Sequence, residues 1–207
     1  MKAKSIKGKS AAEIKKALGQ SMADGYKPTL ACVFLTDVEE INPVAAVLDA
    51  AAITIFGAST SDKFNEEGID PDSIIVLLMD MNPAYFKLVL KDYNAAAVYE
   101  AASEVGTAGK NAFDHPAFII STVDIKIPGE AMIKGLTDKA GMGVTVIGGV
   151  AGEHTQFTGT LFTNHSKTSS GIISLILDED KIDVKGMAVS GWKPVGTEKK
   201  ITKSDGN

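Results

Sequence analysis

The sequence contains little of what several classes of protein depend on. Cys32 is its only cysteine, so an internal disulfide is excluded and a reducing compartment is expected. The three histidines, His115, His154 and His165, form no H-x-x-x-H pair and have no cysteine cluster near them, so no metal site is predicted. No stretch approaches about 18 uninterrupted apolar residues, and the first residues carry lysines without the apolar segment of a signal peptide. We therefore expect a cytoplasmic protein without a membrane partner.

An excess of positive charge is also missing. The formal net charge is −5, and the lysines gather near the two ends of the chain without interleaved aromatic residues, so nucleic acid is not an expected partner. Hydrophobic residues make up 44% and charged residues 23%, which is the balance of a globular protein with a full core.

Familiar nucleotide and nucleophile motifs are absent as well. Residues 106–111 read G-T-A-G-K-N, in which the glycines stand too close together for a phosphate loop and asparagine replaces the metal-binding hydroxyl. Residues 141–143, G-M-G, precede a predicted strand instead of following one, unlike a dinucleotide fingerprint. There is no G-x-S-x-G elbow. We predict no cofactor and find no residue that demands catalysis.

What is present is a regular alternation of helices and strands. Ser10 and Glu13 have the spacing of a capping box, and apolar residues then recur every four positions until Gly25, which predicts a helix. The apolar run at residues 30–35 is too short and too continuous for a surface helix, so it predicts a strand buried on both faces, with Cys32 as a buried thiol.

A second helix and three further strands complete the N-terminal half. Asn42-Pro43 predicts an N-cap followed by proline at the first helical position, and a strand follows at residues 53–56. Residues 73–80 and 86–90 predict two more strands, and the short link between them predicts a β-hairpin. A parallel crossover together with a hairpin requires a mixed sheet.

The same order returns from residue 94. Helical patterns cover residues 94–113 and begin again near residues 128–130, and strands are predicted at 117–122 and 144–147. Residues 53–58, I-T-I-F-G-A, match 144–149, V-T-V-I-G-G, and residues 73–80 match 171–178. We therefore predict one α/β domain over residues 1–207. It consists of two repeats, about 8–93 and 94–196, each α-β-α-β plus a β-hairpin, and forms a mixed parallel and antiparallel sheet packed with helices.

Two small, polar loops follow the matching strands and are the best candidates for a binding site. Ligands of α/β sheets gather at the carboxyl ends of strands, where glycine allows close backbone approach and hydroxyls supply hydrogen bonds. If the halves are copies, the two loops face each other across one cleft. The candidate ligand-binding residues are Gly57, Ala58, Ser59, Thr60, Ser61, Asp62, Gly148, Gly149, Gly152, Glu153 and His154.

Three functions remain open at this point. The first is a sensor that binds a small ligand between the two loops. The second is a hydrolase that uses Glu153 and His154 with a hydroxyl from Ser59 to Ser61. The third is a scaffold or assembly module in which the glycines only shape the strand exits and no cleft lies between the loops.

Four segments in order make the sequence resemble the FIST N domain, a sensory module of signalling proteins. They are residues 1–5 leading into the capped helix, G-A-S-T at 57–60, G-G-V-A-G-E at 148–153, and G-W-K-P-V-G at 191–196. The likeness covers essentially the whole chain. In two places it departs from the family pattern, because Ser61-Asp62-Lys63 stands where Ala-Gly-Glu is usual and Glu153 stands where aspartate is common.

The resemblance implies a function that the residues alone do not prove. It implies an intracellular role in signal transduction, binding of a small ligand such as an amino acid, and a partner in a C-terminal or downstream signalling domain. It supplies no verified binding residues.

Overall fold

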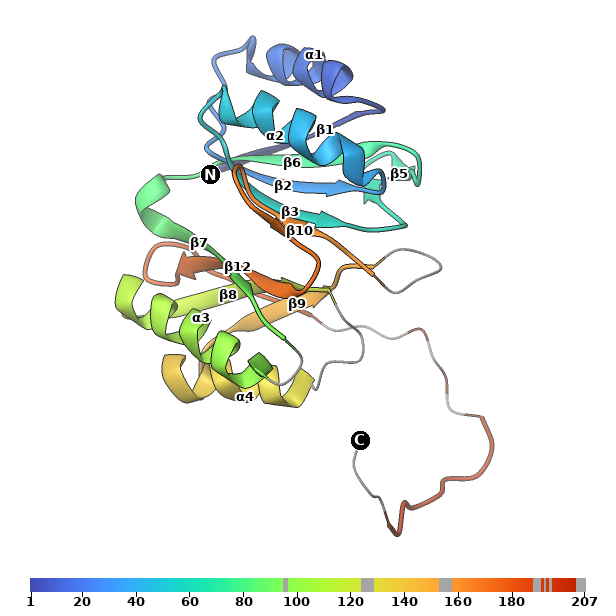
Figure 1. Cartoon of the computed structure of the whole chain (residues 1–207), viewed down its shortest axis with the longest axis vertical. Helices are drawn as coiled ribbons and strands as arrows, with labels where there is room; N and C mark the ends of the chain where they lie inside the picture. The colour runs from blue at the N-terminus through green and yellow to red at the C-terminus, as the bar shows by residue number, and fades with distance from the viewer. Residues whose placement is uncertain are drawn as a thin grey trace.

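The elements of the computed structural model lie in four layers, helices outside and two β-sheets inside (Figure 1). The structure describes residues 1–94, 97–123, 129–152, 158–187, 191, 193 and 195–203. Helices α1 (Ala11–Met22) and α2 (Ile41–Asp49) cover one sheet, and α3 (Val98–Ala112) and α4 (Gly129–Ala140) cover the other. The predicted α/β class with helices packed on mixed sheets is confirmed.

The first sheet has the strand order β1-β6-β2-β3-β10-β11. Its strands are β1 (Lys2–Gly8), β6 (Ile74–Asp80), β2 (Leu30–Leu35), β3 (Thr54–Ser59), β10 (Leu161–Phe162) and β11 (Lys167–Thr168). The second has the order β7-β12-β8-β9, with β7 (Phe86–Asp92), β12 (Gly171–Asp178), β8 (Pro116–Thr122) and β9 (Val146–Val150). A small hairpin of β4 (Phe64–Asn65) and β5 (Gly68–Ile69) stands apart.

The first helix begins as its sequence predicts. Ser10 Oγ accepts a hydrogen bond from the Glu13 N–H at 3.4 Å, and the Glu13 carboxylate accepts one from the Lys9 N–H at 2.8 Å. These contacts satisfy donors that the first turn cannot pair internally.

The predicted start of the second helix is wrong by two residues. The chain enters α2 through a 3-10 turn, Val38–Glu40, which Asp37 caps by accepting the Glu39 N–H at 3.0 Å. The helix itself therefore begins at Ile41, and Asn42 and Pro43 lie inside its first turn, where proline is tolerated because its missing N–H has no helical partner to lose.

The predicted hairpin between residues 73–80 and 86–90 is also wrong. Strand β6 pairs antiparallel with β1 and β2, whereas β7 pairs antiparallel with β12 in the other sheet. The link contains a 3-10 turn, Pro83–Tyr85, capped by Asn82, and it carries the chain from one sheet to the other. In the second half, Asp178 leads into a turn, and no strand follows among the described residues.

The two sheets repeat one pattern of pairing. The order β1-β6-β2-β3 corresponds to β7-β12-β8-β9, and in both the last two strands run parallel while the other pairs are antiparallel. Phe56 of β3 lies opposite Cys32 of β2. Ile147 of β9, which aligns with Phe56 in the match of residues 53–58 with 144–149, lies opposite Ile119 of β8, so both pairs keep the register that the match requires. The first strand in each order, β1 or β7, ends at or before the residue at which the corresponding repeat was expected to begin. That the halves arose by duplication stays a prediction.

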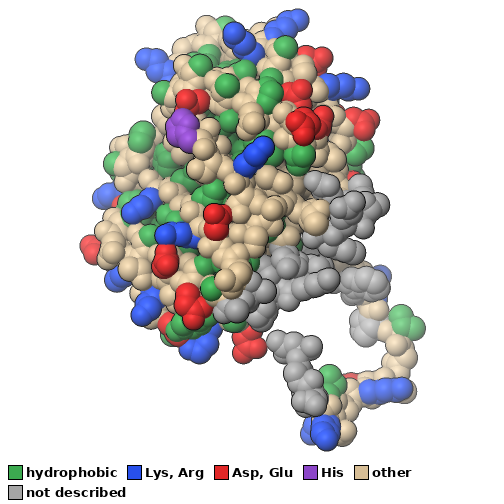
Figure 2. Space-filling view, viewed as in Figure 1, with side chains coloured by type: hydrophobic (Ala, Val, Ile, Leu, Met, Phe, Trp, Pro, Cys, Tyr) green, Lys and Arg blue, Asp and Glu red, His purple; other side chains and the backbone are tan. Residues whose placement is uncertain are grey.

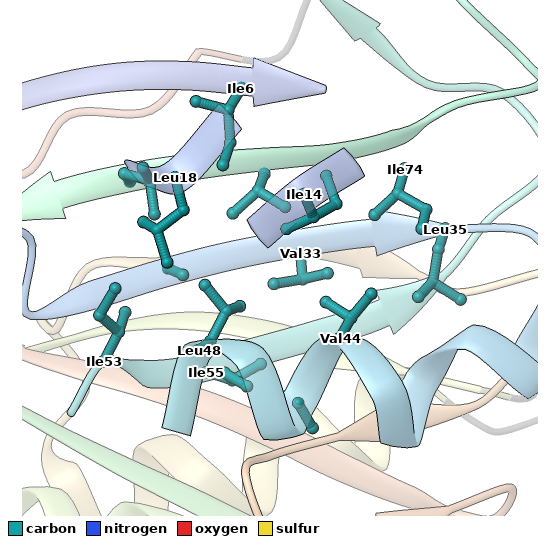
Figure 3. Packing of buried hydrophobic residues seen from close by; sticks show 14 of the residues in the cluster. Ile6, Ile14, Leu18, Val33, Leu35, Val44, Leu48, Ile53, Ile55 and Ile74 are labelled. Carbon is teal, nitrogen blue, oxygen red and sulfur yellow. The ribbon is translucent and has the colours of Figure 1, made fainter. Parts of the chain in front are cut away.

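Buried apolar side chains fill the space between the helices and each sheet. Figure 3 shows α1, α2 and the first sheet packed through residues that include Ile14, Leu18, Val33, Val44 and Leu48, each at most 5% exposed. An equivalent cluster joins α3 and α4 to the second sheet, and a third lies between the sheets. None of the helices in the described ranges has the length and apolar character to span a membrane.

Candidate functional site

The layer between the two sheets is apolar but not closed. Along β2, the side chains that face the helices are fully buried, whereas Cys32 and Phe34, which face the other sheet, are only half-buried. Leu77 on β6 and Ile119 on β8 are half-buried in the same layer. The strand at residues 30–35 is therefore fully closed only on its helix-facing side, and Cys32, expected as a buried thiol, is largely buried but keeps part of its surface accessible.

A cleft of about 710 Å³ opens from this layer. Strands of the first sheet supply Phe34, Phe56, Ala58, Ile75 and Leu77, and β8 and β9 supply the opposite wall. The segment from Thr60 to Glu66, which includes β4, lies at its polar end.

The two predicted loops meet beside this cleft. Thr60 and Gly152 form a parallel β-bridge, and the Ser61 N–H and hydroxyl both donate to the Gly152 carbonyl, at 3.1 and 3.2 Å. The structure thus brings the loops together as expected from the sequence. Ligand binding by them stays a prediction.

The predicted residues divide into those that line the cleft and those that do not. Gly57 does not line it, since a Cβ there would lie 2.4 Å from the Phe162 ring, so this glycine serves packing. Ser61 and Gly152 do not line it either. Glu153 and His154 lie outside the described residues. The predicted residues that line the cleft are Ala58, Ser59, Thr60, Asp62, Gly148 and Gly149.

The two glycines of β9 have different surroundings. A Cβ on Gly148 would lie 2.1 Å from the Ile120 carbonyl oxygen, so only glycine fits there without a shift of the backbone. A Cβ on Gly149 would have no atom within 4 Å and would enter open space. Gly149 is therefore the position from which a side chain could be grown into the cleft.

The hydroxyls of the first loop make one long-range and one local hydrogen bond. Ser59 is fully buried, and its Oγ accepts the Thr160 N–H at 2.8 Å, which holds the end of β3 against the second half of the chain. Thr60 Oγ1 donates to the Asp62 carbonyl at 3.2 Å, within the loop itself.

Lys63 lines the cleft and was not among the predicted site residues. It is 3% exposed, and its ammonium group donates to the Pro71 carbonyl at 2.7 Å, to the Thr36 hydroxyl, and to the Ser61 carbonyl at 3.4 Å. Burial lowers the pKa of Lys63, and nearby carboxylates, Asp70 foremost, partly oppose that shift. These contacts hold the base of the β4–β5 hairpin beside the cleft.

A lysine in a polar loop predicts an exposed side chain, so residue type alone could not identify this role. The only signal was its departure from the family pattern.

Neither the Cys32 thiol nor the two histidines that the structure describes, His115 and His165, line the cleft. Burial raises the pKa of Cys32 to about 12, so the thiol is neutral and a weak nucleophile at ordinary pH. His115 Nδ1 lies 2.9 Å from an Asp180 oxygen and His165 Nε2 lies 3.5 Å from Asp49, both at the surface. Across the described ranges, no three His, Cys, Asp or Glu side chains are grouped to hold a metal ion.

The view in Figure 2 shows cationic and anionic side chains interspersed, without a continuous basic patch on that face.

Comparison with known proteins identifies one family. The family model described as the FIST N domain matches residues 29–207, a range that contains both loops and every strand of the cleft except β1. No curated protein matches the chain.

Proposed function

The chain belongs to the FIST N domain family, whose members are sensory domains of signalling proteins, and from that premise we propose that it binds a small ligand in the cleft between its two sheets. The observation that carries the proposal is the cleft itself, about 710 Å³ in volume, lined by residues of both predicted loops. Small-molecule sites usually measure about 300–1,000 Å³ and combine apolar walls with a few polar groups.

The position of the cleft suits a sensor. Its walls come from both sheets, so a ligand seated there contacts both halves of the fold at once. The halves also meet at the Thr60–Gly152 bridge at the edge of the same cleft. Binding that favours one spacing of the sheets would change the population of that arrangement, which a downstream signalling partner could detect.

The hydroxyls of the first loop contact the backbone of the second half. Ser59 Oγ accepts the Thr160 N–H, and the Ser61 hydroxyl donates to the Gly152 carbonyl. A hydrolase would need one of these hydroxyls beside a general base, and its expected bases, Glu153 and His154, lie outside the described residues. A pure scaffold would not need an open, lined cleft.

A thermal-shift screen of the whole chain against amino acids and common metabolites tests this function. A ligand at 100 times its dissociation constant adds about 2.7 kcal/mol to stability. For a domain of this size that corresponds to roughly 5–10 °C in Tm.

Two leucine substitutions tell cleft binding from other binding. Gly149→Leu fills the cleft and should remove the shift, whereas Gly143→Leu, where a Cβ also meets nothing within 4 Å but which does not line the cleft, should keep it. An equal shift in both variants would place binding elsewhere. Ester or amide turnover that is lost in Glu153→Gln would support the hydrolase instead.

A further inference from the structure

The two walls of the cleft are mainly hydrocarbon. Phe34, Phe56 and Leu77 project from the first sheet, and Ile119 projects from the second. Phe34, Leu77 and Ile119 keep part of their surface in water although they lie between two sheets. Covering apolar surface is favourable by about 25 cal/mol per Å². An apolar molecule therefore gains most at these walls.

The charged side chains that are described in the cleft do not suit an anion. Among its described lining residues, the charged ones are Asp62, Lys63 and Glu66, so Lys63 is the one cation. Its three N–H donors already have three oxygen acceptors, on Thr36, Ser61 and Pro71. A ligand carboxylate at this end would face two carboxylates and would have to take Lys63 away from its partners.

The cost of a carboxylate in such a site is large. Moving an ionised group out of water without a partner costs several kcal/mol. The polar groups on the walls, such as the Ser121 hydroxyl and the backbone beside Gly149, suit a neutral amide, carbonyl or hydroxyl instead.

From these observations we propose that the ligand of the cleft is an uncharged, largely apolar molecule with a neutral hydrogen-bonding group, and not a free amino acid or another carboxylate. This inference rests on the proposed function, because it describes the occupant of the same cleft. It narrows the ligand from any small metabolite to molecules with an aromatic or branched hydrocarbon body.

A matched set of compounds tests the charge requirement. Nile red, which is neutral and apolar, serves as the fluorescent probe of the whole chain, and the competitors are 3-phenylpropanamide, 3-phenylpropanoate and L-phenylalanine. They share one aromatic body and differ in charge. We expect the amide to displace Nile red at concentrations at least about tenfold lower than either carboxylate, a difference of about 1.4 kcal/mol.

Two variants assign the signal to the cleft. Gly149→Leu should abolish the Nile red signal that the amide displaces, and Gly143→Leu should retain it. One contrary outcome is that the carboxylates compete as well as the amide while the Nile red signal stays sensitive to Gly149→Leu. That result would overturn the neutral-ligand inference and leave the binding function intact. Absence of any signal sensitive to Gly149→Leu, together with a negative thermal-shift screen, would overturn both.

Discussion

The seam between α3 and α4 gives the sharpest test of the packing. A Cβ on Gly106 would lie 2.3 Å from the Leu136 carbonyl oxygen, and a Cβ on Gly135 would lie 2.3 Å from that of Tyr99. Both obstacles are backbone atoms, which cannot rotate away as the end of a flexible side chain can. Alanine at either position therefore requires the two helices to separate by about 1 Å to reach normal contact distances.

The expected magnitude follows from two opposing effects. Overpacking of a well-packed contact costs about 1–3 kcal/mol, and the higher helix propensity of alanine returns up to about 1 kcal/mol. We expect Gly106→Ala to lower the free energy of unfolding by about 1–2 kcal/mol. Gly19→Ala is the matched control, because Gly19 is an exposed residue of α1 with no atom within 4 Å of a Cβ, and it should gain about 0.5–1 kcal/mol.

Urea unfolding followed by circular dichroism measures both variants under the same conditions. The two substitutions are chemically identical, so their difference, about 1.5–3 kcal/mol, reports the helix contact and not the residue type. A Gly106→Ala protein as stable as wild type or more stable would refute the close approach of α3 and α4. Equal losses in both variants would also contradict it, because a Cβ at Gly19 has room and alanine there should stabilise the protein.

Two further predictions concern single polar groups. Ser174 on β12 is fully buried, and its hydroxyl has no hydrogen-bond partner among the described residues. Ser174→Ala should therefore leave the free energy of unfolding in urea unchanged or raise it by about 1 kcal/mol. A clear decrease would show that the hydroxyl has a hydrogen-bond partner. Asp24 accepts hydrogen bonds from Lys4 Nζ at 2.9 Å and from the Tyr26 N–H at 3.1 Å, and these contacts, Lys4 first, lower its pKa from the usual 3.8 to about 2. Because the folded pKa is the lower one, this stabilisation is complete above about pH 4 and is lost as the pH falls towards 2. Wild type should therefore exceed Asp24→Asn in stability at pH 5, and a gap that persists undiminished at pH 2 in acid titrations would contradict this account.

Strands and helices with a strong periodic pattern could be predicted from the sequence, whereas elements that form only by pairing with distant strands could not. Residues 30–35 are a continuous apolar run and form β2, and residues 171–178, which are apolar apart from Gly171, Ser174 and Asp178, form β12. Strand β1 escaped prediction because its lysines alternate with other residues at the edge of a sheet and resemble a solvated tail. It is a strand because β6 supplies the backbone partners along its whole length.

The false hairpin has a related cause. A short link between two apolar strands usually closes a hairpin, but β6 is buried on both faces and has its two neighbours in β1 and β2. No edge of β6 remains for β7, which pairs in the second sheet instead. The length of the link limits only the distance between the two strand ends that it joins, whereas strand pairing depends on residues far away in the sequence.

The meeting of the two loops could be predicted from the repeated pattern, whereas the surroundings of their glycines could not, and ligand binding by the loops stays a prediction. The match of Gly57 with Gly148 identified two strand ends that do lie side by side, joined by Thr60 and Gly152. The match could not reveal that both positions need glycine for packing, because the atoms that a Cβ would meet belong to Phe162 and Ile120.

The difference between the two loops explains why a symmetric pattern of strands encloses an asymmetric cleft. On the side of β3, Ser59 is tied to the Thr160 N–H and Lys63 anchors the hairpin by three oxygen acceptors, so this wall is held in place by polar contacts. On the side of β9, Gly149 and Val150 are exposed, and Gly149 leaves open space at its Cβ position. A ligand would thus rest against one fixed wall and one open wall. Because only the open wall can adjust to the ligand at low cost, we expect the change that signals occupancy to begin at β9 and to pass through the Thr60–Gly152 bridge to the first sheet.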